Sequence, residues 1–350
     1  MKVLLAMSGG VDSSVAGALL QEQGHDVVGV TMKLWGGESD TGCCSVSDVD
    51  DARRVAQQLD IDHLVFNFGE DFDRHVVAPY VSAHADGVTP NPCVECNRHL
   101  KFDRLLRRAE QLGFDAIATG HHARVGRRPD GRFTLQRGAD AAKDQSYVVH
   151  MLDQTALSRT LFPVGDIDKA RVRELAAERR LRTASKPDSQ DVCFITSRGG
   201  REAFLGNRIE FRVGRVVAPD GTGIGEVAAL EMVTIGQRRG IGLPGGGPKR
   251  YVLDVDMNAG VVVVGDEDDL MRTSMRVEHV AWTDEPQVGP VRVQCSAHGA
   301  TAKATTAFAG DAGTVDVTWD APQRRVAPGQ SVVFYDAADR VVLGGGIAAR

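Results

Sequence analysis

Residues 7–14 read MSGGVDSS, a turn of small residues that decides the fold of the first half of the chain. An apolar run at residues 3–6 precedes this turn, and a helical pattern at residues 15–23 follows it. Gly9 and Gly10 permit backbone angles that are closed to other residues, so main-chain N–H groups can approach a phosphate closely. A helix that begins here adds unpaired N–H groups and a positive dipole end. The pattern therefore predicts a phosphate-binding loop between a strand and a helix.

Asp12 lies inside this predicted loop. A carboxylate beside phosphates is repelled unless it holds Mg²⁺ or caps the following helix. We favour the helix cap and keep the metal as a second role. The loop lacks the lysine of the common G-x-x-x-x-G-K-[ST] motif and lacks the G-x-G-x-x-G fingerprint of dinucleotide-binding proteins. It is therefore a different class of phosphate loop.

The composition limits the possible classes of protein. A chain of 350 residues with 42% hydrophobic content predicts two or three domains with a large core. The formal net charge of −6 excludes a generally basic protein but permits a local basic patch for nucleic acid. No apolar run approaches the roughly 18 residues of a membrane span, and no signal-peptide pattern is present. We expect a cytoplasmic protein without a membrane partner.

The order of apolar and helical patterns predicts an α/β fold. Short β-branched runs at residues 27–32, 64–68 and 116–119 alternate with helical patterns at residues 49–59, 70–85 and 98–112. Such alternation is typical of a parallel sheet wrapped by helices. A further helix is predicted at residues 169–180, after which short valine-rich segments separated by glycine, proline and aspartate indicate β structure. We therefore predict a parallel-sheet domain at residues 1–198, a central β-rich domain at 199–272 and a C-terminal β-barrel-like domain at 273–350.

The six cysteines of the chain point to thiol chemistry or metal binding rather than to a disulfide scaffold. Cys93 and Cys96 lie in TPNPCVECN (residues 89–97), and Cys193 lies in DSQDVCFI (residues 188–195); both segments are predicted to be polar loops. A CxxC pair suits a redox couple, half of a zinc site or an iron–sulfur ligand set. We interpret the adjacent pair at residues 43–44 as structural and Cys295 as a packing or surface thiol. No residue is assigned to a resident metal ion.

Several segments occur in an order that is similar to a known family. They are SGGVDSS, Met32, CCS at residues 43–45, TPNPCVECN, AIATGH at 116–121, KDQSY at 143–147, DSQDVCFI and TIGQRRG at 234–240. Together they resemble the bacterial tRNA-specific 2-thiouridylases, and SGGVDSS resembles the pyrophosphate-binding (PP) loop of ATP pyrophosphatases. The resemblance is specific through about residue 195 and weaker beyond it.

The resemblance implies an adenine-nucleotide α-hydrolase-like (PP-loop) domain that uses Mg²⁺-ATP. It implies ATP-dependent adenylation of the C2 oxygen of the wobble uridine in tRNA, followed by sulfur transfer to give 2-thiouridine. Cys96 matches the family's nucleophile, and Cys193 matches the residue that carries sulfur as a persulfide, with a disulfide between the two after turnover. The sulfur donor is expected to be a cysteine desulfurase or a sulfur-relay protein. The implied ATP site is Ala6, Met7, Ser8, Gly9, Gly10, Val11, Asp12, Ser13, Met32 and Gly120, and the implied tRNA contacts are Asn91, Pro92, Cys93, Lys143, Asp144 and Gln145.

Other readings stay open at the level of the sequence. Cys93, Cys96 and Cys193 are also a potential ligand set for a [4Fe–4S] cluster, as in other tRNA thiolases. A PP-loop amidotransferase or synthetase that adenylates a small substrate is an alternative enzyme, and a metal- or redox-regulated RNA-binding module is a non-enzymatic one. The chain departs from the family at Cys93, which is aspartate in some relatives, at residues 227–229 and at residues 295–298.

Overall fold

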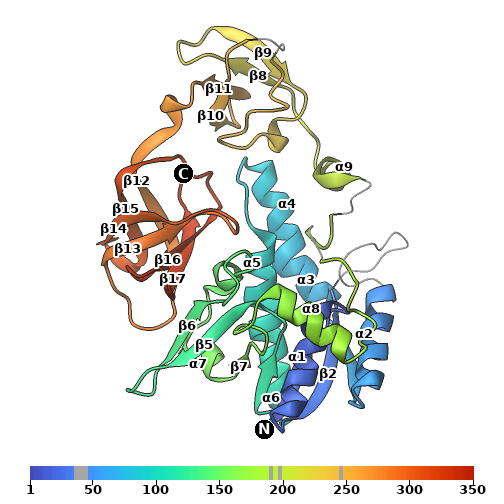
Figure 1. Ribbon diagram of the computed structural model, residues 1–350. Helices are drawn as coiled ribbons and strands as arrows, with labels where there is room; N and C mark the ends of the chain where they lie inside the picture. Colours follow the sequence, from blue (N-terminus) through green and yellow to red (C-terminus); the bar gives the residue numbers. More distant parts are fainter. Residues whose placement is uncertain (35–45, 189–191, 196–198, 244–246) are drawn as a thin grey trace.

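The computed structural model describes residues 1–34, 46–188, 192–195, 199–243 and 247–350 (Figure 1). Among them, no helix is both long enough and apolar enough to cross a bilayer. Cys43, Cys44 and Ser45 lie outside the described residues, as do Ser189, Gln190 and Asp191.

A parallel sheet forms the core of the first part of the chain. Its strand order is β3-β2-β1-β4-β7. The strands are β1 (Lys2–Ala6), β2 (Asp26–Lys33), β3 (His63–Asn67), β4 (Ala116–Ala118) and β7 (Thr160–Leu161). The three predicted strands correspond to β2, β3 and β4, so the predicted α/β class is confirmed.

Helices cover both faces of this sheet, and β1 is therefore buried on both sides. Val3 and Leu5 pack into one cluster with α1 (Val11–Glu22), α2 (Val46–Gln58) and α8 (Lys169–Glu178). Leu4 packs into the cluster on the other face. The elements there are α3 (Gly69–Phe72), η1 (Asp73–Val77), α4 (Ala78–Ala85), α5 (Pro92–Cys96), η2 (Asn97–Arg104), α6 (Leu105–Gln111), η3 (Ser146–Val149) and α7 (Gln154–Ser158). Alternate residues of a strand point to opposite faces, so this burial pattern is that of a doubly covered parallel sheet.

A second, smaller sheet lies at the top of Figure 1, beyond α9 (Gly200–Gly206). Its order is β10-β11-β8-β9, and we call it the central sheet. The strands are β8 (Gly214–Val217), β9 (Gly223–Val227), β10 (Tyr251–Asp256) and β11 (Val261–Gly265), with the short helices η4 (Leu230–Met232) and η5 (Asp268–Leu270). Its valines, including Val216, Val252, Val262 and Val264, form a separate apolar core.

The last part of the chain is a closed barrel. The order β12-β15-β14-β13-β16-β17 closes because β12 also pairs with β17. The strands are β12 (Met271–Trp282), β13 (Gly289–Gln294), β14 (Ala302–Ala309), β15 (Asp311–Arg324), β16 (Ser331–Tyr335) and β17 (Val341–Ala348). The predicted β-rich character of both later parts is confirmed.

A hairpin of the α/β part extends the barrel sheet. β5 (Ala123–Arg127) and β6 (Phe133–Arg137) pair with each other, and β6 pairs with β17 through Gln136–Val341 and Leu135–Val342. The core cluster that contains Leu4 also contains Val333, Tyr335 and Val342 of the barrel. The α/β part and the barrel therefore share both a sheet and an apolar core.

Candidate functional site

The MSGGVDSS turn lies between the carboxyl end of β1 and the start of α1. Gly9 adopts a positive φ of 70°, and a Cβ there would lie 2.4 Å from the carbonyl oxygen of Asp48. The hydroxyls of Ser13 and Ser14 bond to the Gly10 carbonyl at 3.1 and 2.8 Å, and so they brace the turn. Ser8 is exposed, and the first N–H groups of α1 have no intrahelical acceptor. This end of α1 therefore has the local geometry expected of an anion site.

Asp12 does not cap α1. The cap position is Gly10, without a side-chain cap bond, and α1 already begins at Val11. The Asp12 carboxylate instead accepts bonds from Lys169 Nζ at 2.7 Å to both oxygens and pairs with His122 Nε2 at 3.0 Å. Burial alone would raise the pKa of Asp12, but these two partners outweigh it and hold the pKa below its ordinary value. The favoured cap role was wrong, because a distant lysine satisfies the carboxylate.

Lys169 connects this loop to a second acidic residue. Its ammonium lies 2.9 Å from Asp188 Oδ1, and Asp188 also pairs with Lys143 at 2.8 Å and with Arg173 at 2.6 Å. Burial opposes ionisation of Asp188, but Lys143 and Lys169 lower its pKa to about 2. Lys169 starts α8 and carries no sequence signal of its own. Its role emerges only from the convergence of segments 157 residues apart.

The remaining predicted nucleotide residues lie at the same edge of the sheet. Met32 is buried near the end of β2, and Gly120 follows β4. A Cβ on Gly120 would lie 2.7 Å from the Ser13 amide nitrogen and 2.8 Å from the Asp12 carbonyl carbon. The structure therefore brings Gly120 against the MSGGVDSS turn, at the carboxyl ends of the strands where ligands of such folds bind.

His121 has a structural environment. Its Nδ1 lies 2.7 Å from the Thr119 hydroxyl, and its ring packs against Phe102 and Phe162. Burial lowers the pKa of His121 well below the ordinary value, so the ring is neutral at physiological pH.

The structure places Cys93 and Cys96 on helix α5 rather than in a loop. Pro92 occupies the first turn, and the Asn91 side chain caps the helix by accepting a bond from the Cys93 amide at 3.1 Å. Proline is preorganised for the first helical position, and asparagine is a preferred cap. The loop prediction was wrong, although the Asn-Pro pair carried the helix signal. Cys93 is exposed, whereas Cys96 is buried in the core cluster of the sheet.

Cys193 lies against the same cluster as Cys96. The neighbouring Phe194 anchors this segment, with ring centroids 5.6 Å from Phe72 and 5.5 Å from Tyr80. Among the described residues, no group of three His, Cys, Asp or Glu side chains is arranged to hold a metal ion. The three cysteines therefore do not fit the ligand set of an iron–sulfur cluster in this conformation.

The KDQSY segment makes contacts within the protein. The Asp144 carboxylate accepts bonds from Arg137 at 2.6 Å and from the Ser146 hydroxyl at 2.8 Å. The side chain of Gln145 accepts a bond from the His122 amide at 3.0 Å, and Lys143 pairs with Asp188. Arg137 also pairs with Asp339 of the barrel at 2.8 Å. This segment therefore helps to join the α/β part to the barrel.

The TIGQRRG segment is a turn beside β10. Gly236 and Gln237 exchange backbone bonds with Val252, and Arg238 and Arg239 are exposed. Within the described part of the chain, neither arginine takes part in an ion pair. At the positions where the sequence departs from the family, Val227 is buried at the end of β9, and Cys295 packs against the barrel core.

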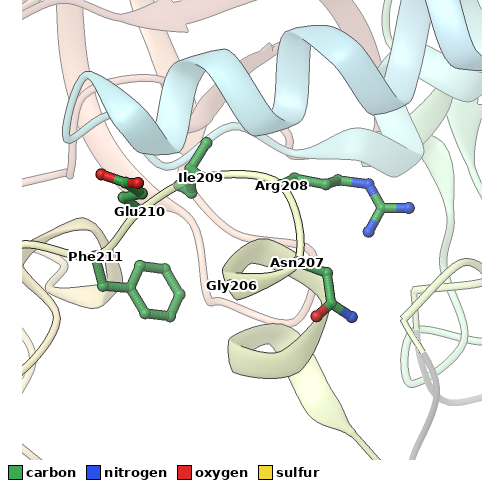
Figure 2. Close-up of a pocket in the computed structure, with 6 residues that line it drawn as sticks. All are labelled: Gly206, Asn207, Arg208, Ile209, Glu210 and Phe211. Atoms are coloured by element: carbon green, nitrogen blue, oxygen red, sulfur yellow. The ribbon is translucent and has the colours of Figure 1, made fainter.

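One cavity lies away from all of these residues. It is lined by consecutive residues from the end of α9 into the connection to β8: Gly206, Asn207, Arg208, Ile209, Glu210 and Phe211 (Figure 2). The Arg208 guanidinium covers the ring of Phe204 at 4.0 Å. No predicted site residue contributes to this cavity, so it is not the candidate site.

Three family models match consecutive parts of the chain. Residues 1–197 match the tRNA methyl transferase HUP domain, residues 202–266 the tRNA methyl transferase PRC-barrel domain, and residues 272–348 the aminomethyltransferase beta-barrel domain. The first model alone spans more than half of the chain.

Two full-length relatives carry the same name, tRNA-specific 2-thiouridylase MnmA. The protein of Roseiflexus sp. (strain RS-1) is 43% identical over 376 residues, covering 100% of this chain and 99% of the relative. The protein of Mycolicibacterium gilvum (strain PYR-GCK) is 46% identical over 363 residues, covering 100% and 99%. A solved 4-thiouridine synthetase–RNA complex with bound ATP is 21% identical and covers 55% of this chain and 44% of that chain. Its TM-score against this chain is 0.37.

Proposed function

The chain belongs to the family of tRNA-specific 2-thiouridylases, and from this premise we propose that it replaces the C2 oxygen of a wobble uridine in tRNA by sulfur, with ATP as co-substrate. The observation that carries the proposal is the full-length identity of 43% and 46% to relatives of that name. The family models are described as methyl transferase domains, but the PP loop and the two cysteines beside one core cluster favour thiolation.

The ATP site of this proposal is the edge of the parallel sheet. Residues 6–13, with Met32 and Gly120, hold ATP, and the first N–H groups of α1 face its phosphates. The uracil C2 oxygen is a poor leaving group, so transfer of AMP to it, with release of pyrophosphate, makes it able to depart. Mg²⁺ neutralises phosphate charge and commonly binds through one or two carboxylates plus phosphates. Asp12 is the carboxylate proposed for this role, and binding the ion would require it to give up a bond from Lys169.

The sulfur chemistry is assigned to Cys193 and Cys96. In one route, the terminal sulfur of a Cys193 persulfide attacks C2 and AMP leaves; the Cys96 thiolate then attacks the Cys193 Sγ, so C2 keeps the sulfur. In the other route, Cys96 attacks the Cys193 Sγ first and releases hydrosulfide, which attacks C2. Both routes leave a Cys96–Cys193 disulfide, which a two-electron reductant must reopen. A persulfide ionises more readily than a thiol and is a better nucleophile, which suits this role.

The tRNA contacts of the proposal begin at Asn91, Pro92 and Cys93, beside Cys96. Cys93 is exposed at the start of α5, which supports a contact with the target base. Residues 143–145 are proposed as a second contact. All three side chains bond within the protein, but Lys143 is the cation among them, with a side chain that is 39% exposed. It is the residue best suited to a phosphate, which would compete with Asp188 for its ammonium.

The remaining parts of the proposal concern partners and organisation. A cysteine desulfurase or a sulfur-relay protein supplies sulfur to Cys193, and the reaction takes place in the cytoplasm, where tRNA is found. We propose residues 1–198 as the catalytic domain and residues 199–272 and 273–350 as the two β-rich domains. The amidotransferase alternative is disfavoured by the family to which the chain belongs. The RNA-binding alternative leaves the PP loop without a role.

The test is thiolation of a wobble-uridine tRNA with Mg²⁺-ATP, cysteine and a cysteine desulfurase, read as retardation on a mercury-containing gel. Retardation by the native protein, lost in both Cys96→Ser and Cys193→Ser but kept in Cys295→Ser, is the expected result. Formation of AMP with another acceptor and no retardation would favour the synthetase. Thiolation by anaerobically purified protein without iron would overturn the cluster route.

A further inference from the structure

The segment between α4 and α5 is where the three parts of the molecule meet. Residues 86–91 follow α4. Figure 1 shows this helix running from the α/β part toward the central sheet, with the barrel to its left. The guanidinium of Arg350, beyond the last barrel strand, donates to the carbonyl of Asp86. The buried ring of His84, two residues earlier on α4, donates a hydrogen bond to the backbone carbonyl of Glu231 beside the central sheet.

Thr89 has each of its polar groups bonded to another part of the molecule. Its amide donates to the Pro328 carbonyl at 3.0 Å, and its carbonyl accepts from Gln330 Nε2 at 2.5 Å; both partners belong to the loop before β16 of the barrel. Its hydroxyl lies 3.2 Å from the Thr234 hydroxyl, which belongs to the turn beside the central sheet. Thr89 is therefore held by both β-rich parts at once.

A glycine permits the close approach of the barrel loop. Gly329 adopts a φ of 88°, and a Cβ there would lie 2.3 Å from Val88 Cγ1 and 3.3 Å from the Thr89 carbonyl carbon. Only glycine adopts this backbone conformation without strain and also leaves room for the neighbouring chain.

The connection from Thr89 to the cysteine helix is short and stiff. Pro90 and Pro92 each fix φ near −65°, and each restricts the residue before it. Between them, Asn91 caps α5 by accepting from the Cys93 amide. A displacement of Thr89 is therefore passed to the start of α5, and hence to Cys93 and Cys96, rather than absorbed by free torsions.

The connection from Thr89 to the surface arginines is also made of hydrogen bonds. The Thr234 amide donates to Gln237 Oε1 at 3.0 Å, and Gln237 Nε2 donates to the Arg239 carbonyl at 2.8 Å. Arg238 and Arg239 are exposed and suited to backbone phosphates. A polyanion held by these arginines therefore acts on the same turn that holds the Thr89 hydroxyl.

We propose that Thr89 is a positioning residue through which the central sheet and the barrel set the placement of the α5 cysteines, so that tRNA docked on the β-rich parts changes the reactivity of Cys96. This inference rests on the proposed function, and it concerns the hydrogen bonds to Thr234 and Gln330 rather than any contact of Thr89 with substrate.

The test compares the native full-length protein with four single variants and one double variant. Thr89→Val removes the hydroxyl with little change in shape, and Gln330→Met removes the amide donor. Gln323→Met is the matched control, because Gln323 is a half-buried barrel glutamine whose amide bonds locally, to the Ala321 carbonyl at 3.0 Å. The first readout is the alkylation rate of Cys96 with and without tRNA, measured by mass spectrometry of proteolytic peptides. The second is the kcat and KM of thiolation.

We expect tRNA to change the Cys96 alkylation rate of the native protein about threefold or more. Thr89→Val and Gln330→Met should each abolish most of this response and lower kcat about fivefold, while KM for tRNA and ATP and the melting temperature stay near the native values. Thr234→Val should reproduce Thr89→Val, and the double variant should be no worse than either single variant.

The inference would be overturned if native alkylation of Cys96 were indifferent to tRNA, or if the Thr89→Val and Gln330→Met proteins matched Gln323→Met in both kcat and the tRNA response. A loss of kcat accompanied by an equal rise in KM and a fall in melting temperature would assign these bonds to folding alone and would also overturn it. Failure of the proposed function is distinct, because the native protein would then not thiolate tRNA at all.

Discussion

The ammonium of Lys169 lies 2.7 Å from both carboxylate oxygens of Asp12, so a residue of α8 neutralises the carboxylate within the phosphate loop. A carboxylate in this position otherwise repels the phosphates of a nucleotide. The same ammonium reaches Asp188, five residues before Cys193. Lys169 thus bridges the loop proposed to hold ATP and the segment that leads to the proposed persulfide carrier.

Replacement of Lys169 by glutamine should leave Asp12 partly buried without its cation. We expect tRNA-dependent pyrophosphate release to fall at least about tenfold and the free energy of unfolding to fall by about 1–3 kcal/mol, since Asp12 keeps some exposure. Pyrophosphate release and urea unfolding measure the two effects. Arg171→Gln, on the exposed side of the same helix, is the control and should match the native protein. A Lys169→Gln protein that releases pyrophosphate at the native rate would contradict this role of Lys169 in neutralising Asp12.

Replacement of Gly120 by alanine should disturb the phosphate loop. The added Cβ would lie 2.7 Å from the Ser13 nitrogen, and this neighbour is backbone, so the loop must shift. We expect KM for ATP to rise about tenfold or more, measured by pyrophosphate release over a range of ATP concentrations. Gly223→Ala, where a Cβ meets no atom within 4 Å, should leave KM unchanged. Equal KM values in both variants would show that Gly120 does not face the nucleotide.

The buried ring of His150 should make stability depend on pH. Burial, aided by Arg98, lowers the pKa of His150 to about 4, below its unfolded value of 6.5. The unfolded chain therefore binds the proton first, and stability that is complete above pH 6.5 is lost as pH falls toward 4. At about 1.4 kcal/mol per pH unit, this residue costs roughly 2–3 kcal/mol between pH 7 and 4.5. His150→Asn should lose less stability than the native protein over this interval in urea unfolding, and an identical loss would contradict the assignment.

The Cys295 thiol should be chemically inert. Burial raises its pKa to about 12, so very little thiolate exists at neutral pH, and the thiolate is the reactive form. We expect iodoacetamide to leave Cys295 unmodified under native conditions while the exposed Cys93 reacts. Cys295→Ala should thiolate tRNA within about twofold of the native rate. A loss of tenfold or more would instead give Cys295 a part in the reaction.

The α/β fold and the phosphate loop were predictable because their signals are local. Alternating apolar runs specify strands buried on both faces, and two glycines between a strand and a helix specify the loop. The start of α5 was missed although its signal was also local, since Asn91 and Pro92 form a recognisable helix start. A cap rule applied to that pair would have placed Cys93 and Cys96 on a helix.

The other features that the sequence did not predict depend on contacts between distant segments. No sequence rule pairs Lys169 with Asp12, because the two residues are brought together only when α8 packs against α1. The sequence of the β5–β6 hairpin does not indicate that it joins a barrel formed by residues some 200 positions later in the chain. The ion pair between Arg137 and Asp339 spans a similar separation and was equally unpredictable. The bonds of Thr89 to Pro328, Gln330 and Thr234 are of the same kind.

The pairing of β6 with β17 also limits how this molecule can be divided. A fragment that ends near residue 198 would keep β6 but lose its neighbour, which would leave a row of unpaired backbone groups and uncover Leu135 and Tyr147. Open strand edges of this kind promote aggregation. The last 80 or so residues therefore cover the β6 edge and part of the apolar core of the first part of the chain. Exchanging the barrel between relatives requires that the β5–β6 hairpin be exchanged with it.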